Sequence, residues 1–458
     1  MPIRMFRTWR TLVDMAADFS FIAVVIVTAM RWIGAGLAVD FTIVVGYALI
    51  LALVMAPINA WLGLYQRVQH RTIYNTRARA VLSLHLAIPI ASGIFILLPL
   101  TEVSRPFLEI SAMIGIFGVL SNRVRLAHAK HLPLARDRVL VYGVGERAQV
   151  VNEVLAHAGE FVDIVGFYPS PVVEPQRVPT DKVLPRSHEL TETVRMLNAA
   201  EIVVAVTDRR GGALPLRELL DCKLRGVRVY DLASYVEQTM GQIRLDALYA
   251  GWLIFGDGFA QGAWRVVIKR CFDIICALVL LVPAVPVMLL ASVLIAAESG
   301  FPILFRQERV GKDGHLFQVV KFRSMRTDAE KDGKPRWATA KDDRVTRVGR
   351  LMRKTRIDEL PQIFNVLAGQ MSMVGPRPER PYFVEQLTDQ IPFYAVRHAI
   401  KPGLTGWAQV RYHYGASVED SVEKLQYDLY YVKNHSLLLD LVVLFETVGV
   451  VLNADGAH

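Results

Sequence analysis

The sequence predicts a membrane protein in three parts: apolar helices first, then an α/β domain with a parallel sheet, then a mainly helical domain with a second apolar segment. Of its 458 residues, 53% are hydrophobic, which exceeds the ~45–50% typical of soluble domains. Long uncharged segments occur before residue 137 and again at residues 274–297. Between them, short strand-like runs alternate with helical runs. The length suits two or three domains.

Residues 1–136 contain four apolar segments, at residues 19–39, 41–66, 80–101 and 107–122. A helix needs ~20 residues to cross a bilayer. The second and third segments carry no charge, whereas the first contains Arg31 and the fourth is short and contains Glu109. Cations gather before the first segment, between the second and third, and after the fourth. This alternation predicts four transmembrane helices with both ends cytoplasmic, and a buried helical core would not explain it.

The net charge of +9 comes mainly from this apolar part, where 13 Lys and Arg stand against 5 Asp and Glu. The positive charge therefore indicates membrane topology, and nucleic-acid binding is not expected. The three cysteines, Cys222, Cys271 and Cys276, lack the spacing of a metal site and indicate no disulfide framework.

Residues 137–245 read as an alternating α/β domain, with strands at 138–142, 161–167, 201–206 and 227–230 and a first helix at 149–158. Gly143-Val-Gly-Glu-Arg-Ala148 follows the first strand and matches the G-x-G-x-x-A dinucleotide fingerprint. The second strand ends in Gly166-Phe-Tyr-Pro-Ser170, without the acidic residue that binds a ribose. A Rossmann-like domain with a structural or regulatory role is favoured over a working NAD site. Residues 246–264 read as a linker.

The third part, residues 265–458, opens with an uncharged segment at 274–297 that is long enough to cross a bilayer. Pro283 and Pro286 lie inside it, and each removes a helix hydrogen bond and bends the axis. Positive residues on both sides argue against a crossing; they are Lys269, Arg270, Arg306, Arg309 and Lys312. The pattern predicts a broken, re-entrant helix over 266–297 that enters the cytoplasmic leaflet and returns. Two helices kinked within a full span remain the alternative.

Beyond this segment, residues 302–306 and 316–322 read as two strands joined by a glycine-rich turn. Residues 418–434 read as a helix. The apolar tail at 436–452 contains Asp440 and Glu446, and it is expected to pack on the domain or at the membrane interface.

The stretch 350–379 carries the chemistry. A cationic run leads into the carboxylate pair Asp358 and Glu359, and Pro361 then opens a short apolar helix that Gly369 can end. The pair therefore lies at or just before a helix N-terminus, where negative charge is favoured. Adjacent helical residues point ~100° apart, so one carboxylate can face a phosphorus atom and the other a metal. This predicts a site for a phosphorylated substrate with Mg²⁺; a capped, solvated helix start is the alternative for an isolated pair.

Several motifs in one order carry a resemblance over about residue 265 to the C-terminus. They are Phe305-Arg-Gln-Glu-Arg-Val-Gly311, Lys321-Phe-Arg-Ser-Met325, residues 353–362, Gly375-Pro-Arg-Pro-Glu379, residues 401–409 and residues 427–438. With them the chain resembles the bacterial sugar transferase family, the polyprenyl-phosphate hexose-1-phosphate transferases that begin exopolysaccharide and O-antigen synthesis. The four predicted spans resemble the long forms of this family. Residues 208–259 are similar to its subgroup associated with exosortase-type exopolysaccharide loci.

The resemblance implies transfer of hexose 1-phosphate from a UDP-sugar to undecaprenyl phosphate, with release of UMP. UDP-glucose is the favoured donor. The resemblance also implies Mg²⁺ and a covalent aspartyl-phosphosugar intermediate. Asp358 matches the nucleophile and Glu359 the metal-binding partner. Pro286 matches the membrane break by its spacing to Gln307, and Pro283 is an additional proline at this break. Substrate-binding positions are matched by Lys321, Arg353, Arg377, Arg411 and Asp428. Of the cationic run, Arg353 is expected to contact phosphate, and Arg350, Lys354 and Arg356 anionic headgroups.

The expected location is the bacterial inner membrane, with both termini and the active site cytoplasmic. The expected partners are the UDP-sugar, undecaprenyl phosphate and membrane lipid. A homo-oligomer and contacts with polysaccharide-assembly proteins stay open. Two other functions fit part of the sequence: a non-catalytic membrane scaffold or regulator of polysaccharide assembly, and an NAD-dependent sugar-modifying enzyme that uses the Gly143–Ala148 loop.

Overall fold

The structure is a computed structural model that describes scattered residues before 137 and then residues 137–158, 162–172, 174–207, 214–248, 258–259, 262–327, 329, 344–412 and 417–452. The chain forms two compact units, Met1–Tyr230 and Asp231–His458. The four predicted N-terminal spans fall almost entirely outside the described residues. Between the second and third of these segments, the buried Ser83 hydroxyl donates to the Asn59 side chain.

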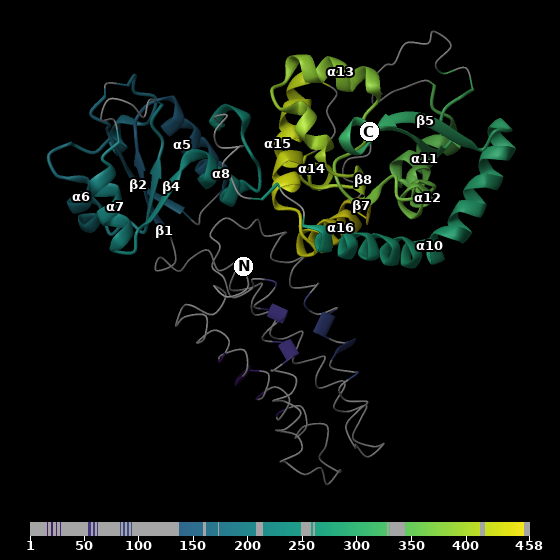
Figure 1. Ribbon diagram of the computed structural model, residues 1–458, viewed down its shortest axis with the longest axis horizontal. Helices are drawn as coiled ribbons and strands as arrows, with labels where there is room; N and C mark the ends of the chain where they lie inside the picture. Colours follow the sequence, from purple (N-terminus) through teal and green to yellow (C-terminus); the bar gives the residue numbers. More distant parts are fainter. Residues whose placement is uncertain are drawn as a thin grey trace. The chain divides into compact units, whose positions relative to one another are not determined.

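The α/β part of the first unit contains a four-stranded sheet in the order β2-β1-β3-β4 (Figure 1). Strand β1 pairs in parallel with both β2 and β3, so the strands expected from the sequence are confirmed. The strands are β1 Asp137–Tyr142, β2 Val162–Tyr168, β3 Glu201–Val204 and β4 Arg228–Asp231, and the helices are α5 Glu146–Ala158, η3 Thr180–Lys182, α6 Leu190–Met196 and α7 Leu216–Leu224. Val139, Leu140 and Ile202 are fully buried at its centre, which explains the near-continuous apolar runs of these strands.

The crevice at the carboxyl ends of β1 and β3 is filled by the chain's own groups. A Cβ on Gly143 would lie 2.6 Å from the Ala205 carbonyl oxygen, so glycine allows the loop to approach β3. The Glu174 carboxylate accepts from the Thr207 N–H at 2.9 Å. Its other oxygen would lie 2.9 Å from a Cβ on Gly145. In open α/β sheets this crevice, at the switch in strand order, is where a ligand binds.

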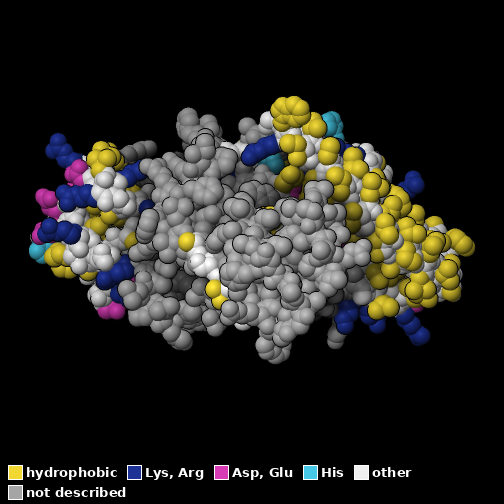
Figure 2. All heavy atoms as spheres, turned by 90° about the horizontal axis from the view of Figure 1, so that it is seen from below, with side chains coloured by type: hydrophobic (Ala, Val, Ile, Leu, Met, Phe, Trp, Pro, Cys, Tyr) yellow, Lys and Arg dark blue, Asp and Glu magenta, His cyan; other side chains and the backbone are white. Residues whose placement is uncertain are grey.

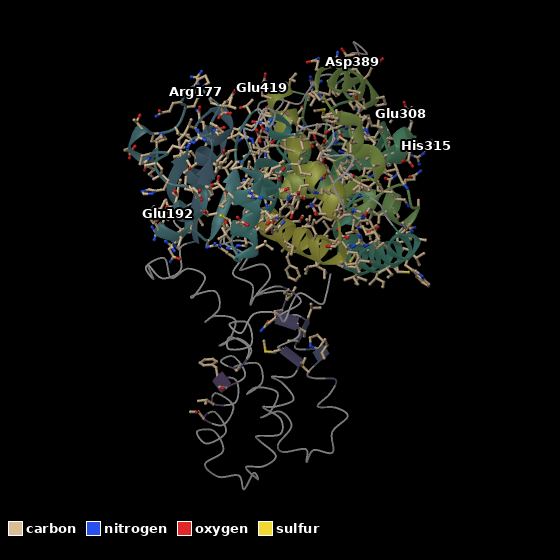
Figure 3. All side chains as sticks on the ribbon, turned by 60° about the vertical axis from the view of Figure 1, so that its left-hand side comes forward. Arg177, Glu192, Glu308, His315, Asp389 and Glu419 are labelled. Atoms are coloured by element: carbon tan, nitrogen blue, oxygen red, sulfur yellow. The ribbon has the colours of Figure 1, made fainter. Side chains whose placement is uncertain are left out.

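Two further contacts close the same loop. The backbone N–H of Arg177 donates to the Val144 carbonyl oxygen at 2.9 Å. Arg177 is labelled in Figure 3. The Arg147 side chain donates to the Val206 carbonyl oxygen at 3.4 Å. The fingerprint sequence therefore forms a tight strand–turn–helix. The place where such a turn would bind a phosphate lies against the Glu174 carboxylate.

The second unit is mainly helical, with two small sheets: the antiparallel pair β5–β6 and the parallel pair β7–β8. Glu308 and His315 mark the β5–β6 hairpin in Figure 3. Its elements are α8 Leu232–Met240, η4 Leu245–Ala247, α10 Ala263–Ser299, β5 Leu304–Val310, η5 Lys312–Gly314, β6 Leu316–Phe322, α11 Arg347–Lys354, η6 Ile357–Glu359, α12 Gln362–Leu367, β7 Ser372–Val374, α13 Pro381–Gln390, η7 Tyr394–Ala399, β8 Gly403–Thr405, α14 Trp407–Arg411, α15 Val418–Asn434 and α16 Leu437–Leu452. The expected hairpin, the helix at 418–434 and the helical tail are confirmed.

Helix α8 packs within this second unit, although the sequence pattern grouped its residues with the α/β domain. Glu237 accepts from the Lys433 ammonium at 2.7 Å and from the Asn434 amide at 2.7 Å. The Gly241 carbonyl oxygen accepts from the Trp407 indole N–H at 2.7 Å. Glu237 in α8 and Gly241 after it thus bind α15 and α14, respectively.

Helix α10 is a continuous helix of 37 residues that runs through both Pro283 and Pro286. The sequence pattern predicted a break; Figure 1 instead shows an unbroken ribbon that runs along one side of the unit and then turns. Proline removes a hydrogen bond and bends the axis, but neighbouring turns can carry the helix past it. Pro283 and Pro286 are both exposed. In the part of the chain that the structure describes, α10 is the one helix long and apolar enough to cross a membrane.

Most of the surface of α10 is apolar and exposed. Val282 is 77% exposed, Val279 68% and Val293 65%. Figure 2 shows hydrophobic side chains gathered at this end of the molecule, with Lys and Arg at the edge. An apolar patch of this kind marks a surface for membrane or protein contact rather than for water.

Both ends of α10 are fastened to the second unit. Near its start, Arg270 donates to the Val366 and Leu367 carbonyl oxygens of α12 at 2.6 and 2.7 Å. At its end, Arg323 donates to the Ser299 and Gly300 carbonyl oxygens at 2.8 and 2.6 Å. Orphan carbonyls at two helix C-termini are thereby satisfied. The cations that flank the apolar segment in sequence therefore include residues that bind the protein itself.

Candidate active site

The pair Asp358 and Glu359 lies in η6, between α11 and α12. Helix α11 begins at Thr346, whose hydroxyl accepts from the Gly349 N–H at 2.9 Å. Arg356 then adopts a left-handed conformation, with φ of 59°, and turns the chain into η6. Pro361 opens α12 as the sequence predicted, because its fixed φ suits a first helical turn. Both carboxylates are buried at this turn.

Glu359 is held by three cations. Its Oε1 lies 2.8 Å from Arg377 Nη2, 3.5 Å from Lys321 Nζ and 3.8 Å from Arg356 Nη1. Burial by itself would raise the pKa of Glu359, but the charges of Arg377, Lys321 and Arg356 outweigh it and lower that pKa below its ordinary value. Glu359 is therefore a stable carboxylate at neutral pH.

Asp358 has the opposite character. Its Oδ1 is buried and has no hydrogen-bond partner among the described residues. Burial and the neighbouring Glu359 charge raise the pKa of Asp358 from 3.8 to about 6, against the opposing effect of nearby cations that include Arg353. A buried carboxylate oxygen without a donor, on a group whose pKa is raised, marks Asp358 as a candidate functional residue.

The strand β6 and the helix α12 are locked together beside this pair. The Asn365 amide donates to the Gln318 carbonyl oxygen at 2.7 Å, and its oxygen accepts from the Val320 N–H at 3.1 Å. Lys321 follows on the same strand, and burial lowers the pKa of its ammonium. The ammonium is thus held close to the carboxylates by β6.

Arg377 is brought to the pair by the β7–β8 sheet. A Cβ on Gly403 would lie 2.1 Å from the Gly375 backbone nitrogen, and one on Gly406 would lie 2.2 Å from the Gly375 carbonyl oxygen. Only glycines allow these two backbones to approach so closely. Arg377 Nη1 then reaches Gln409 Oε1 at 3.4 Å while Nη2 binds Glu359.

Two of the predicted substrate-binding residues are engaged elsewhere. Arg411 Nη2 lies 2.9 Å from Glu446 Oε1 on α16, and its guanidinium stacks over the Trp407 ring at 4.3 Å. Asp428 is 2% exposed and pairs with the buried Arg397 at 2.7 Å. The structure thus brings together Asp358, Glu359, Lys321, Arg353 and Arg377, and places Arg411 and Asp428 in ion pairs of their own.

Sequence reasoning missed Arg397 and gave Arg356 another role. Arg356 belongs to the cationic run and was expected at lipid headgroups, whereas its left-handed turn directs it to Glu359. Arg397 lies in the short 3₁₀ helix η7, outside the motifs that the sequence shares with the family. Nothing in its local pattern could have identified it.

Comparison with known proteins agrees with the motifs. A family model described as bacterial sugar transferase matches residues 264–454. Among curated proteins, the chain is 43% identical over 242 residues to the UDP-N-acetylgalactosamine-undecaprenyl-phosphate N-acetylgalactosaminephosphotransferase of Aeromonas hydrophila, which covers 53% of this chain and 56% of that protein. It is 44% identical over 194 residues to the UDP-glucose:undecaprenyl-phosphate glucose-1-phosphate transferase of Caulobacter vibrioides, which covers 42% of this chain and 72% of that protein.

A third relative is the undecaprenyl-phosphate galactose phosphotransferase of Salmonella typhimurium, 39% identical over 209 residues, with 42% of each chain covered. The chain spans about half the length of the Aeromonas and Salmonella proteins that it matches. The matched region contains the whole of the paired-carboxylate site, from Lys321 to Gln409. By its motifs, its family match and these relatives, the chain belongs to the bacterial sugar transferase family.

Proposed function

We propose that this protein transfers a sugar 1-phosphate from a UDP-sugar to undecaprenyl phosphate and releases UMP. The observation that carries the proposal is the contrast between two adjacent carboxylates: Glu359 is held by Arg377, Lys321 and Arg356, whereas Asp358 keeps a buried oxygen with no hydrogen-bond donor among the described residues. The names of the relatives supply the reaction class. Glucose is the first sugar to test, with N-acetylgalactosamine and galactose as the alternatives.

The proposed reaction has two steps. An Asp358 oxygen attacks the phosphorus that carries the sugar, and the bond from that phosphorus to the oxygen bridging it to the UMP phosphorus breaks. UMP leaves with that bridging oxygen, and an aspartyl-phosphosugar remains. An oxygen of undecaprenyl phosphate then attacks the same phosphorus and displaces the Asp358 carboxylate, which regenerates the enzyme. Splitting the transfer in this way lets the lipid arrive after UMP has gone.

Cations prepare the first step. A sugar diphosphate and an ionised Asp358 repel one another, so positive charge must compensate before they meet. Arg377, Lys321 and Arg353 lie around the pair and supply that charge. Because the first two are held by β7–β8 and β6, they need little reorganisation on binding.

Mg²⁺ is proposed as the cofactor, with Glu359 as its ligand. Among the described residues, no group of three or more His, Cys, Asp or Glu could hold a metal. Mg²⁺ in phosphoryl-transfer sites binds one or two carboxylates together with substrate phosphates, and the adjacent Asp358 and Glu359 fit that arrangement. When bound, the ion would neutralise diphosphate charge.

We also propose that α10 is re-entrant and embeds the protein in the cytoplasmic leaflet of the inner membrane. A straight helix of this length would reach roughly 55 Å, well beyond the ~30 Å hydrocarbon core. Its two ends are nevertheless bound to one compact unit, through Arg270 and Arg323. Single cysteines placed at the exposed Arg265 and Arg306 of a cysteine-free protein should be labelled from the same side of sealed vesicles. Labelling from opposite sides would exclude the re-entrant topology.

The function is tested by UMP release from purified protein with undecaprenyl phosphate and UDP-glucose, UDP-galactose or UDP-N-acetylgalactosamine. Asp358→Asn is expected to lose both UMP release and the mass of the phosphosugar adduct. Asp389→Asn, at an exposed carboxylate on α13 (Figure 3), is the matched control and should keep both. Normal turnover by Asp358→Asn would sink the mechanism, and no UMP release with any donor would sink the function.

A further inference from the structure

The loop that carries Arg377 has few backbone N–H donors of its own. Pro376 and Pro378 have no N–H, and the alternation of prolines keeps this loop extended. Its carbonyl oxygens therefore depend on donors from elsewhere. Four consecutive carbonyls, those of Pro376, Arg377, Pro378 and Glu379, accept respectively from Gly403 N at 2.9 Å, Arg397 Nη2 at 3.0 Å, Arg309 Nη1 at 3.1 Å and Val310 N at 3.0 Å.

The donor to the Arg377 carbonyl is itself fixed by a buried cluster. Arg397 is 4% exposed. Its Nη2 lies 2.7 Å from Asp428 Oδ2 on α15, and its Nη1 donates to the Tyr394 hydroxyl at 2.7 Å. Burial raises the pKa of Tyr394 to about 12, so its hydroxyl stays neutral and accepts the bond. The guanidinium therefore bridges α15, η7 and the Arg377 loop.

The charge of Arg397 is costly without Asp428. An unpaired guanidinium in so buried a place would carry a large desolvation penalty. The pair is held in one geometry because the planar fork of arginine reaches three acceptors at once, which a lysine ammonium on a flexible stem does not reproduce. Asp428, expected from the resemblance to bind substrate, thus has a different partner in the structure.

We propose that Arg397, with Asp428 as its counter-charge, is a positioning residue for Arg377. This inference rests on the proposed function. Arg397 holds the backbone carbonyl of Arg377, and the guanidinium of the same residue binds Glu359 at 2.8 Å. A line of contacts therefore runs from Asp428 through Arg397 and Arg377 to Glu359. Release of the carbonyl would let the Arg377 guanidinium drift from the position in which it meets the donor diphosphate.

The kinetic test uses Arg397→Gln, Arg397→Lys and Asp428→Asn in the full chain. A displacement of about 1 Å at a positioning group can cost ~100-fold in rate, so Arg397→Gln should lower kcat/KM for the UDP-sugar by about that factor. Arg397→Lys keeps the charge but loses the planar fork, so its kcat/KM should lie between those of the wild-type protein and Arg397→Gln. Since Arg397 acts through Arg377, Arg377→Ala combined with Arg397→Gln should be within about threefold of Arg377→Ala alone.

Arg323→Gln is the matched control. Arg323 is also a buried arginine that donates to backbone carbonyls, but those carbonyls belong to the end of α10. In the double variant of Arg323→Gln and Arg377→Ala, the fold-loss of activity should equal the product of the two single fold-losses, because the two residues act independently. Multiplicative losses for Arg397→Gln as well would overturn the proposal and leave Arg397 as a fold residue.

A second measurement does not depend on turnover. Hydrogen–deuterium exchange at the amides of Gly403 and Val310, which donate to the Pro376 and Glu379 carbonyls of this loop, should accelerate in Arg397→Gln and Asp428→Asn and remain unchanged in Arg323→Gln. If Arg397→Gln does not fold, Arg397→Lys carries the same comparison. Unchanged exchange in the Arg397 and Asp428 variants would overturn the positioning role. Absence of UMP release by the wild-type protein would instead defeat the proposed function, and the exchange result would still decide whether Arg397 holds the loop.

Discussion

At the scale of single residues, the adjacent carboxylates Asp358 and Glu359 differ because of what surrounds them. Glu359 faces three cations, whereas Asp358 Oδ1 meets no donor within the described parts of the chain. The pKa of Glu359 is therefore lowered and that of Asp358 is raised to about 6. Environments that push the pKa values of two acids apart are a sign of separate chemical roles.

The two carboxylates should affect stability with opposite signs. Asp358 binds an extra proton in the folded state between its ordinary pKa of 3.8 and its folded pKa of about 6, so stability falls as pH rises through that window. Asp358→Asn should therefore increase the free energy of unfolding at pH 7.5 by on the order of 1–3 kcal/mol and raise the unfolding temperature. This gain should vanish at pH 4. An unchanged or lower unfolding temperature at pH 7.5 would contradict the raised pKa.

Glu359→Gln is the matched control. The lowered pKa of Glu359 means that its ionised form stabilises the fold above its ordinary pKa, and that this contribution is lost only as pH falls through the lower folded value. Its replacement should lower the unfolding temperature at pH 7.5.

The pH dependence of the reaction should report Asp358. A protonated carboxyl group is a poor nucleophile, so formation of the phosphosugar adduct should decrease tenfold per unit below a pH of about 6. Glu359 stays ionised over this range and adds no second step there. The measurement is single-turnover UMP release by the wild-type protein between pH 5 and 8. A rate that is flat down to pH 5 would show that Asp358 is not the titrating nucleophile.

At the scale of elements, the site depends on short segments that glycine and proline shape. Helix α12 begins after Pro361 and ends at Leu367, and Gly369, which has φ of 84°, turns the chain away from it. Strands β7 and β8 are three residues each, and their connection holds because Gly375, Gly403 and Gly406 pack backbone against backbone. These elements contribute little area, so their close contacts determine where Arg377 lies.

Gly403→Ala should therefore disrupt the site more than its size suggests. The added Cβ would lie 2.1 Å from the Gly375 nitrogen and 2.3 Å from the Thr405 carbonyl oxygen, both of which are backbone atoms that cannot move aside. Unfolding experiments should show a loss on the order of 4 kcal/mol or more, together with loss of UMP release. Gly262→Ala is the control, since no heavy atom lies within 4 Å of its added Cβ. Equal stability of the two variants would refute the close packing.

At the scale of the whole molecule, the chain combines a unit that contains the family-matched region with an α/β unit whose crevice holds the Glu174 side chain. The second unit starts at Asp231, whereas the family match starts at residue 264. Helix α8 lies outside the match, yet its Glu237 binds Lys433 and Asn434 on α15. Residues before the matched region are therefore part of the same compact unit.

The α/β unit should not bind a dinucleotide. The Glu174 carboxylate lies against Gly145 and accepts from Thr207 in the crevice where a pyrophosphate would sit, and like charges repel. NADH titrated into the full chain at millimolar concentration should give no saturable fluorescence change. Saturable micromolar binding of NADH by the wild-type protein would contradict this reading of the crevice.

Local pattern was enough for many of the elements. Short apolar runs indicated β1 to β4, and the bounds expected for α15, residues 418–434, are those observed. Pro361 and Gly369 located α12, and an uncharged run located α10, because proline, glycine and hydrophobic periodicity act within a few residues of where they occur. The same patterns placed Asp358 and Glu359 immediately before a short helix.

The sequence by itself thus predicted the strands of the α/β domain, the β5–β6 hairpin, the helices α12 and α15, the place of the Asp358–Glu359 pair and, through its motifs, the family. It did not predict the strands β7 and β8, and it grouped α8 with the α/β domain. Only the tertiary structure decided the partners of each charge. It brought Lys321 and Arg377 to Glu359, paired Asp428 with Arg397 and Arg411 with Glu446, and placed Glu174 in the crevice of the α/β unit. The reason is physical: a local pattern records which side chains a segment carries, whereas an ion pair depends on distances between segments that meet only after packing.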